Sequence, residues 1–214
     1  SVPDEDIYMG CRIYGISDEA NNCFNYGDIS VITPLPHDVS SEYVYGIGGT
    51  ASYCENYGDI TVNAERDVQA GGVGIISYYS ENFGTVNVSG KEVLASGIGG
   101  HAVYCINRGT VTARGEEVYA GGIAAKITAY GDKEATMPNC ENTANVYAYG
   151  DIEAYAGGIL AYGNESFANC INRGSVRAYC SGETEGSTHC DAGGIIGFAW
   201  VSNESWWGVE HSER

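Results

Sequence analysis

Cysteines, carboxylates and tyrosines are the residues of this chain whose types and spacing could do chemistry. The 214 residues include eight cysteines, 28 acidic residues and 17 tyrosines. Thiols can act as nucleophiles or metal ligands, and carboxylates can bind Ca²⁺ or act as acid and base. Tyrosines can bind a sugar or a protein. The spacing within each group decides which of these roles to expect.

Five cysteines recur at one position of a repeated pattern: Cys23, Cys54, Cys105, Cys140 and Cys170. Ser80 stands at the equivalent place in the third of the six copies. One small residue per copy predicts a ladder of free, buried thiols, because pairing would distort the ladder. Cys180 and Cys190 instead share an insertion, and we expect a disulfide there if the protein is extracellular. A metal site that adds His189 and Asp191 to them is disfavoured, because the spacing fits no common zinc pattern.

Acidic residues recur at two positions of the pattern. Asp28 and Asp59 follow an Asn-x-Gly sequence, and a second set recurs before a Gly-Gly pair: Asp67, Glu92, Glu117 and Asp151. Stacked like charges are unfavourable unless solvent or a cation intervenes. The hypothesis is weak binding of Ca²⁺ at these carboxylates, with no other cofactor expected. The alternative is that the net charge of −18 only keeps the protein soluble.

Aromatic residues are the most suggestive ligand-binding candidates. Tyr26, Tyr57 and Phe83 occupy the middle of Asn-x-Gly in three successive copies, and Tyr53 and Tyr104 precede the cysteine. Such rings could cover the edge of the body. They could also form a platform for sugar rings or a protein partner, since tyrosine supplies area and a hydroxyl at low entropic cost.

No catalytic site is predicted. His37, His101, His189 and His211 are scattered, and no His-Glu-x-x-His or Gly-x-Ser-x-Gly element occurs. The Gly-Ile-Gly-Gly stretches lack the helix and lysine of a phosphate loop. A paired-carboxylate glycosidase stays open, because any two acids across a groove could serve.

Charge and hydropathy bear on the partners. A net charge of −18 argues against nucleic acid and anionic membrane surfaces. No apolar run approaches the ~20 residues that a membrane-spanning helix needs, so no membrane insertion is expected. The chain starts at Ser1 without a signal peptide, which predicts a processed mature form or a segment of something longer.

Six copies of one short pattern position all these residues. The pattern reads Cys-x-Asn-x-Gly-x-(Ile/Val), followed after a variable stretch by Gly-Gly-(Ile/Val). The glycines before the repeated Ile or Val lie 26, 25, 25, 36 and 36 residues apart. Alternating apolar residues without a helical stripe predict three short strands per unit, which is the size of one coil of a parallel β-helix. So short a repeat cannot bury its own apolar face, and the copies must stack.

Stacking predicts ladders of equivalent residues. Ile and Val at positions 29, 60, 86, 111, 146 and 176, and at 47, 73, 98, 123, 159 and 195, should point inward. Asparagines should stack at a corner where the chain takes the left-handed conformation: Asn25, Asn56, Asn82, Asn107, Asn142 and Asn172. Ala144 replaces glycine at one corner, which should be altered. Insertions at 33–44, 126–138 and 179–191 are expected to be corner loops that carry a binding surface.

The expected fold class is therefore all-β, a parallel β-helix (β-solenoid) of about six coils with capped ends, in one domain. Residues 1–22 should form an N-terminal partial coil or cap, 23–197 the six repeats, and 198–214 a C-terminal cap. Trp200, Trp206 and Trp207 are expected to plug the last coil or to face a neighbour.

The repeats resemble the GLUG-type repeats of bacterial cell-surface proteins. The resemblance rests on Gly-Gly-Ile and on Asn-Cys-x-Asn-x-Gly-x-Val, most closely at 192–197 and 169–176, and covers roughly 23–197. Ser80 and Ala144 depart from the pattern. The resemblance implies surface display or adhesion.

The predicted function is a non-catalytic extracellular module that binds a glycan or a host protein through corner loops and tyrosines. One alternative is a stalk or filament subunit that self-associates through its ends. A carbohydrate-active enzyme is the least favoured alternative.

Overall fold

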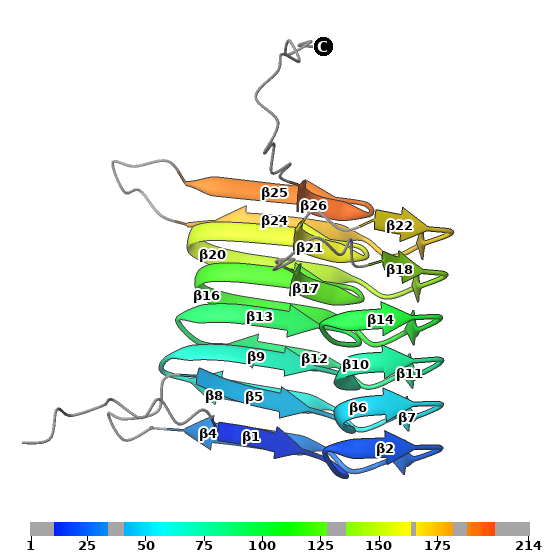
Figure 1. The fold of residues 1–214 in the computed structure, drawn as a ribbon. Coiled ribbons are helices and arrows are strands. Elements are labelled where there is room, and N and C mark those ends of the chain that lie inside the picture. The colour runs from blue at the N-terminus through cyan, green and yellow to red at the C-terminus, as the bar shows by residue number, and fades with distance from the viewer. Residues whose placement is uncertain (1–10, 34–40, 128–135, 164–165, 182–187, 200–214) are drawn as a thin grey trace, which may run out of the picture.

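The chain folds as a parallel β-helix, as the repeat predicts. The computed structural model describes residues 11–33, 41–127, 136–163, 166–181 and 188–199. The regular elements within these residues are all strands, and neighbouring coils pair in parallel, as β5 (Ser41–Tyr45) does with β9 (Asp67–Gly71). The coils rise from the N-terminal strands to the C-terminal ones in one stack (Figure 1).

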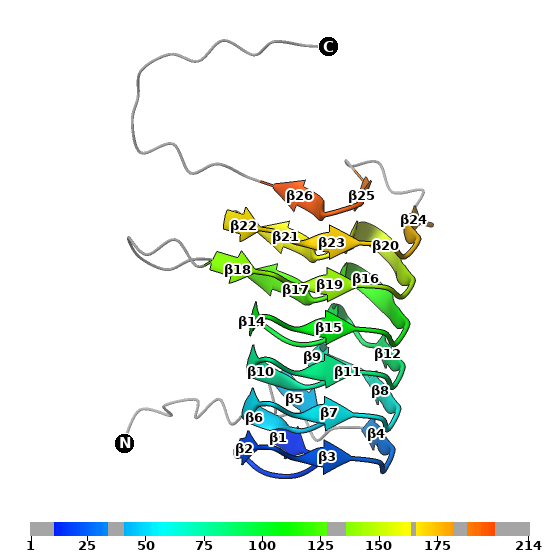
Figure 2. The same cartoon turned by 90° about the vertical axis from the view of Figure 1, so that its right-hand side faces the viewer.

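Each coil has four sides, and the strands of one side stack along the body (Figures 1 and 2). The first side contains β1 (Cys11–Tyr14), β5, β9, β13 (Glu92–Ser96), the second halves of β16 (Val111–Gly121) and β20 (Val146–Gly157), and β25 (His189–Gly193). The second side contains β2 (Glu19–Asn21), β6 (Gly48–Ser52), β10 (Gly74–Tyr78) and β14 (His101–Val103). It continues as β17 (Ala124–Ile127), β21 (Leu160–Gly163) and β26 (Ile196–Ala199), beside β18 (Thr136–Pro138) and β22 (Ser166–Ala168).

The third side faces the viewer in Figure 2 and has the shortest strands. They are β3 (Phe24–Asn25), β7 (Glu55–Asn56), β11 (Glu81–Asn82), β15 (Ile106–Asn107), β19 (Glu141–Asn142) and β23 (Ile171–Asn172). The fourth side contains β4 (Ile29–Thr33), β8 (Ile60–Ala64), β12 (Val86–Ser89), the first halves of β16 and β20, and β24 (Val176–Cys180). Three strands per coil were expected, and four sides are found. The reason is that two-residue strands are too short to show a period-two alternation.

The core is two apolar strips that run along the body. One lies between the first and fourth sides and includes the ladder Ile60, Val86, Val111 and Val146. The other lies between the second and third sides and includes Ile47, Val73, Ile98, Ile123 and Ile159. Full burial of each such side chain stabilises the fold by roughly 1.5–3 kcal/mol. Both inward ladders predicted from the repeat are therefore present.

A row of buried asparagines separates the two strips. Each side-chain Nδ2 donates to the Oδ1 of the next coil, as from Asn56 to Asn82 at 2.9 Å and from Asn107 to Asn142 at 2.8 Å. The glycine before the repeated Ile or Val leaves room for this row, because a Cβ on Gly72 would lie 2.4 Å from the Asn82 Cγ and 2.1 Å from a backbone oxygen. The two halves of the repeat therefore depend on each other.

The left-handed corner lies elsewhere than the sequence suggested. Positive φ occurs at the residue before each cysteine or serine of the repeat: Asn22, Tyr53, Tyr79, Tyr104, Asn139 and Asn169, at 49° to 57°. The asparagines and glycines of Asn-x-Gly do not adopt it. At Gly109 glycine provides space, since a Cβ there would lie 1.8 Å from the Gly84 oxygen. Ala144 does not break its corner, because Asn142 Nδ2 still donates to the Ala144 oxygen at 2.8 Å.

The insertions are shorter than expected, because the strands on both sides of them join the ladders. The described parts of 33–44 and 179–191 belong to β4, β5, β24 and β25. The loop segments 34–40, 128–135 and 182–187 lie outside the described residues. So do residues 1–10 and 200–214, and with them the three tryptophans. Residues 11–21 of the predicted N-terminal cap already contain β1 and β2. The described residues include no helix that is long and apolar enough to cross a membrane.

Candidate binding surface

The third side presents a column of aromatic rings at the middle residue of Asn-x-Gly. Tyr26 and Tyr57 stack with ring centroids 4.9 Å apart, and Tyr57 and Phe83 with centroids 4.6 Å apart and planes 4° from parallel. Arg108 ends the stack, with its guanidinium carbon 5.7 Å from the Phe83 centroid. We call Tyr26, Tyr57 and Phe83 the Tyr57 column. The spacing is that of neighbouring coils, so the fold itself imposes the stack.

A second column lies where the second side turns into the third. Tyr53, Tyr79 and Tyr104 stack at 5.0 and 4.8 Å, with planes within 7° of parallel. Above them Asn139 and Asn169 take the same position and form an amide hydrogen bond of 3.1 Å. We call the three tyrosines the Tyr79 column. Tyr79 itself was missed from the sequence because it precedes Ser80 rather than a cysteine.

The backbone at the Tyr79 column is locally unfavourable. The three tyrosines have φ of 49° to 56°, a region that asparagine and glycine tolerate far better than aromatic residues. Such a conformation costs on the order of 1 kcal/mol per residue and tends to occur at functional sites. Three other coils of the same protein place asparagine there, so the fold does not itself require tyrosine.

Stacking determines which part of each ring is available. An inner ring such as Tyr79 or Tyr57 has a neighbouring ring against each face, so its edge and hydroxyl face outward. Tyr26 is 73 % exposed and Tyr53 is 56 % exposed, both at the ends of their columns. Sugar rings bind aromatic faces, and only the column ends offer a free face. The rings inside the columns present only their edges and hydroxyls to a partner.

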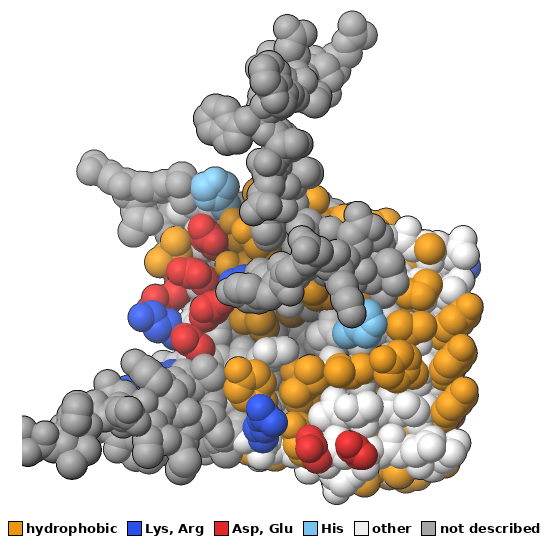
Figure 3. Space-filling view, in the orientation of Figure 1, with side chains coloured by type: hydrophobic (Ala, Val, Ile, Leu, Met, Phe, Trp, Pro, Cys, Tyr) orange, Lys and Arg blue, Asp and Glu red, His pale blue; other side chains and the backbone are white. Residues whose placement is uncertain are grey.

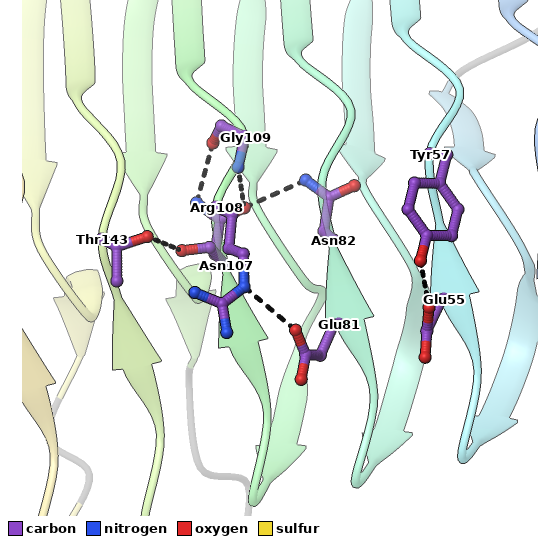
Figure 4. A network of polar contacts seen from close by, with 8 residues as sticks. All are labelled: Glu55, Tyr57, Glu81, Asn82, Asn107, Arg108, Gly109 and Thr143. Carbon is purple, nitrogen blue, oxygen red and sulfur yellow. Dashed lines mark hydrogen bonds and ion pairs between the residues drawn. The ribbon is translucent and has the colours of Figure 1, made fainter.

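Carboxylates lie between the two columns in the chain order, because Glu55 stands midway between Tyr53 and Tyr57. Figure 4 shows Glu55 beside Tyr57, and Glu81 beside Arg108. Glu81 pairs with Arg108 at 3.0 Å, and Glu141 in the same way with Arg173 at 2.7 Å. Glu55 has no arginine one coil above it and accepts a hydrogen bond from the Tyr57 hydroxyl instead. That bond is the main reason why the pKa of Tyr57 is raised to about 12.

The cysteine ladder is built of free thiols. Cys54, Cys105 and Cys140 are buried, and Cys23 and Cys170 at the two ends are half-buried. Ser80 fills its place by accepting a hydrogen bond from the Cys54 N–H at 3.1 Å, much as Cys54 Sγ accepts from the Cys23 N–H at 3.4 Å. The ladder therefore forms part of the second apolar strip of the core.

Cys180 and Cys190 form a disulfide that joins the end of β24 to β25.

Acidic side chains form a row on the first side, visible as red patches at the left of Figure 3. Asp67, Glu92 and Glu117 occupy successive coils of this row, and Lys126 pairs with Glu92 at 3.0 Å. Asp151 is not part of the row, contrary to the sequence prediction. A bulge between Gly115 and Glu117 shifts the register, so that Glu153 pairs with Glu117. Asp151 instead accepts a hydrogen bond from the Ser181 hydroxyl at 2.6 Å.

The other acidic pair has backbone partners. The Asp28 carboxylate accepts the Asp59 N–H at 2.9 Å, and the Asp59 carboxylate accepts the Thr85 N–H at 2.8 Å. Across the described residues, no three His, Cys, Asp or Glu side chains are arranged to hold a metal ion. Calcium binding at these two rows stays a prediction, and a melting temperature that millimolar Ca²⁺ leaves unchanged would remove it.

The described histidines show no catalytic partnership. His101 packs edge-on against Tyr78 at 6.5 Å, and His189 lies exposed on β25. His37 and His211 lie outside the described residues.

Comparison with family models, with curated proteins and with solved structures finds no match to this chain. The two aromatic columns are the most extensive exposed feature described above.

Proposed function

We propose that this chain is a non-catalytic extracellular module for adhesion or display, and that the Tyr57 and Tyr79 columns are its binding surface. The observation that carries the proposal is the Tyr79 column. Three coils have tyrosine at a backbone position whose left-handed conformation costs asparagine less free energy. The rings of these tyrosines are exposed. A structural role alone would be served by the asparagine of the other coils.

Rigidity supports the same proposal. Each ring stacks on at least one neighbouring ring at 4.6–5.0 Å, so it loses little conformational freedom when a partner binds. Tyrosines that are fixed before binding are typical of recognition surfaces. The disulfide Cys180–Cys190 fits an oxidising compartment, and the GLUG-like repeats fit surface display.

The geometry favours a protein partner over a glycan. The inner rings offer edges and hydroxyls, and Glu55 and Glu81 place carboxylates between the columns. Hydroxyls and carboxylates bind the backbone and the basic side chains of a protein well. A glycan could stack on the column ends alone, at Tyr26 and Tyr53. Both partner classes belong in the test.

A binding screen against extracellular proteins and glycans tests the proposal, with two variants of the Tyr79 column. Replacing Tyr53, Tyr79 and Tyr104 together by Phe keeps the stack and removes the hydroxyls. Replacing all three by Asn gives these coils the residue that the other three coils have at this position. Asparagine also tolerates the left-handed backbone better than tyrosine, so this variant should stay folded. We expect the Asn variant to lose binding of a protein partner by about tenfold or more, as hot-spot tyrosines do.

Tyr147→Ala is the matched control, because Tyr147 lies on β20 of the fourth side, away from both columns. It should bind like the wild type. Saturable binding that the Asn variant retains in full would contradict the proposed surface. Turnover of an oligosaccharide would contradict the non-catalytic role.

A further inference from the structure

The two ends of the described body complement each other. The first coil contains β1 to β4 and the last contains β23 to β26. Because equivalent residues stack in columns, each column has one residue at the N-terminal end and one at the C-terminal end. Placing a second copy on top of the first in the same orientation would bring these two residues together.

The inward ladders are incomplete at both ends. Ile29 and Val176 are half-buried, whereas Ile60 and Val146 of the same ladder are fully buried. On the outside, Phe24 and Ile171 end one column and are 52 % and 42 % exposed. Ile32 and Tyr179 end another and are 72 % and 43 % exposed. Each apolar residue would thus meet an apolar residue of the second copy.

The amide row has a direction that a second copy would continue. Every Nδ2 donates toward the C-terminal end, from Asn25 to Asn56 at 2.7 Å and finally from Asn142 to Asn172 at 2.8 Å. Asn172 therefore ends the row with a donor, and Asn25 begins it with an acceptor. Only a head-to-tail arrangement joins the two, because head-to-head contact would oppose two acceptors.

Charged residues match in the same register. The outward column of the first side runs from Arg12 through Tyr43 and Tyr155 to Asp191. A second copy would place its Arg12 over Asp191. In the Tyr57 column it would place Tyr26 over Arg173, which repeats the packing of Arg108 against Phe83. These columns bring no two like charges together.

We propose that this chain assembles head to tail with further copies of itself, the N-terminal coil of one stacking on the C-terminal coil of the next. Such a contact uses two different surfaces and leaves a free surface at each end, so it produces an open filament rather than a closed dimer. The filament would repeat the aromatic columns along its length. The proposal goes beyond ligand binding and does not depend on it.

Charge reversal at Arg12 and Asp191 tests the proposal with the full chain. Sedimentation velocity of the wild type should show mass growing with concentration above the 22.7 kDa of one copy. Arg12→Asp and Asp191→Arg should each weaken assembly by about tenfold or more, because each opposes like charges at the junction. An equimolar mixture of the two variants restores opposite charges at every junction and should assemble again.

Arg66→Asp is the control, since it makes the same charge change in the middle of the body and should leave assembly unchanged. Circular dichroism of each variant checks the fold. A wild type that stays monomeric at all concentrations would overturn the proposal. So would assembly that the charge reversals do not weaken, or variants that fail to recover when mixed.

Discussion

At the scale of single residues, the asparagine row explains why one polar residue recurs in an apolar core. Asn107 is fully buried and makes four side-chain hydrogen bonds. It donates to Gly109 and Asn142 at 2.9 and 2.8 Å, and accepts from Asn82 and the Gly109 N–H at 2.9 and 3.2 Å. Its donors and acceptors are all used, as burial requires.

We predict that Asn107→Ala lowers the free energy of unfolding by about 2–4 kcal/mol, because it leaves several buried polar groups without partners. Urea unfolding measures the change. Asn87→Ala is the control, since Asn87 is exposed on β12 and has one 3.4 Å contact to Arg114. It should change stability by less than about 0.5 kcal/mol. Equal effects of the two substitutions would show that the row is not structural.

The thiols of the cysteine ladder should differ in reactivity along the body. Interaction with the Cys140 thiol lowers the pKa of Cys170 below its ordinary value, whereas burial raises the pKa of Cys105 to about 11. The thiolate is the reactive form. At pH 7 we therefore expect iodoacetamide to alkylate Cys170 long before Cys105, with a rate for Cys170 that falls as the pH is lowered through its pKa. Mass spectrometry of the peptides measures both rates, and Cys170→Ser removes the fast site. Equal rates at the two residues would contradict this prediction.

At the scale of strands, the acidic row on the first side opposes folding at neutral pH. Burial first, and then the charges of Glu92 and Glu153, raise the pKa of Glu117 above its ordinary value. A pKa that is higher in the folded protein than in the unfolded chain means that protonation of the group favours folding. Stability from this group is thus present at acid pH and is lost as the pH rises through the raised pKa.

Glu117→Gln should therefore stabilise the protein at pH 7, by a few tenths of a kcal/mol, because solvent screens much of the repulsion. The gain should disappear at a pH below the ordinary pKa of glutamate, where Glu117 is already neutral. Thermal unfolding at the two pH values measures both effects. Glu65→Gln, at an exposed turn between β8 and β9, is the control. A gain that is the same at both pH values would point to packing instead of charge.

The same strands show how far sequence reasoning reaches. Residues with a fixed spacing, such as Ile60, Val86 and Val111, were placed correctly because equivalent positions of stacked coils must share an environment. Asp151 was misplaced because a bulge changes the spacing inside one coil, and a bulge leaves no mark in a repeat pattern. The left-handed corner was misplaced because Asn-x-Gly resembles a turn, whereas the tyrosines that adopt it resemble surface residues. Local propensity and tertiary packing disagree at that position, and this disagreement is the reason why we propose a binding role for it.

At the scale of the whole molecule, each coil contacts only the coils above and below it, and stability should be close to a sum over neighbours. The central coils have both neighbours and contain the fully buried ladders, whereas the described end coils are largely exposed. Each coil therefore resembles a unit that can be counted, removed or added.

Deleting residues 80–104 removes one coil of 25 residues and joins Tyr79 directly to Cys105. The new junction is of the Tyr-Cys type found at Tyr53–Cys54, and both flanking coils keep their register, so we expect a folded protein that is one coil shorter. Deleting 80–92 is the control, because it removes half a coil and opposes the third side of one coil to the first side of the next. Circular dichroism and urea unfolding should show native strands and a cooperative transition for the first deletion, and neither for the second. If both deletions unfold the protein, the body folds as one cooperative core rather than as a stack of coils.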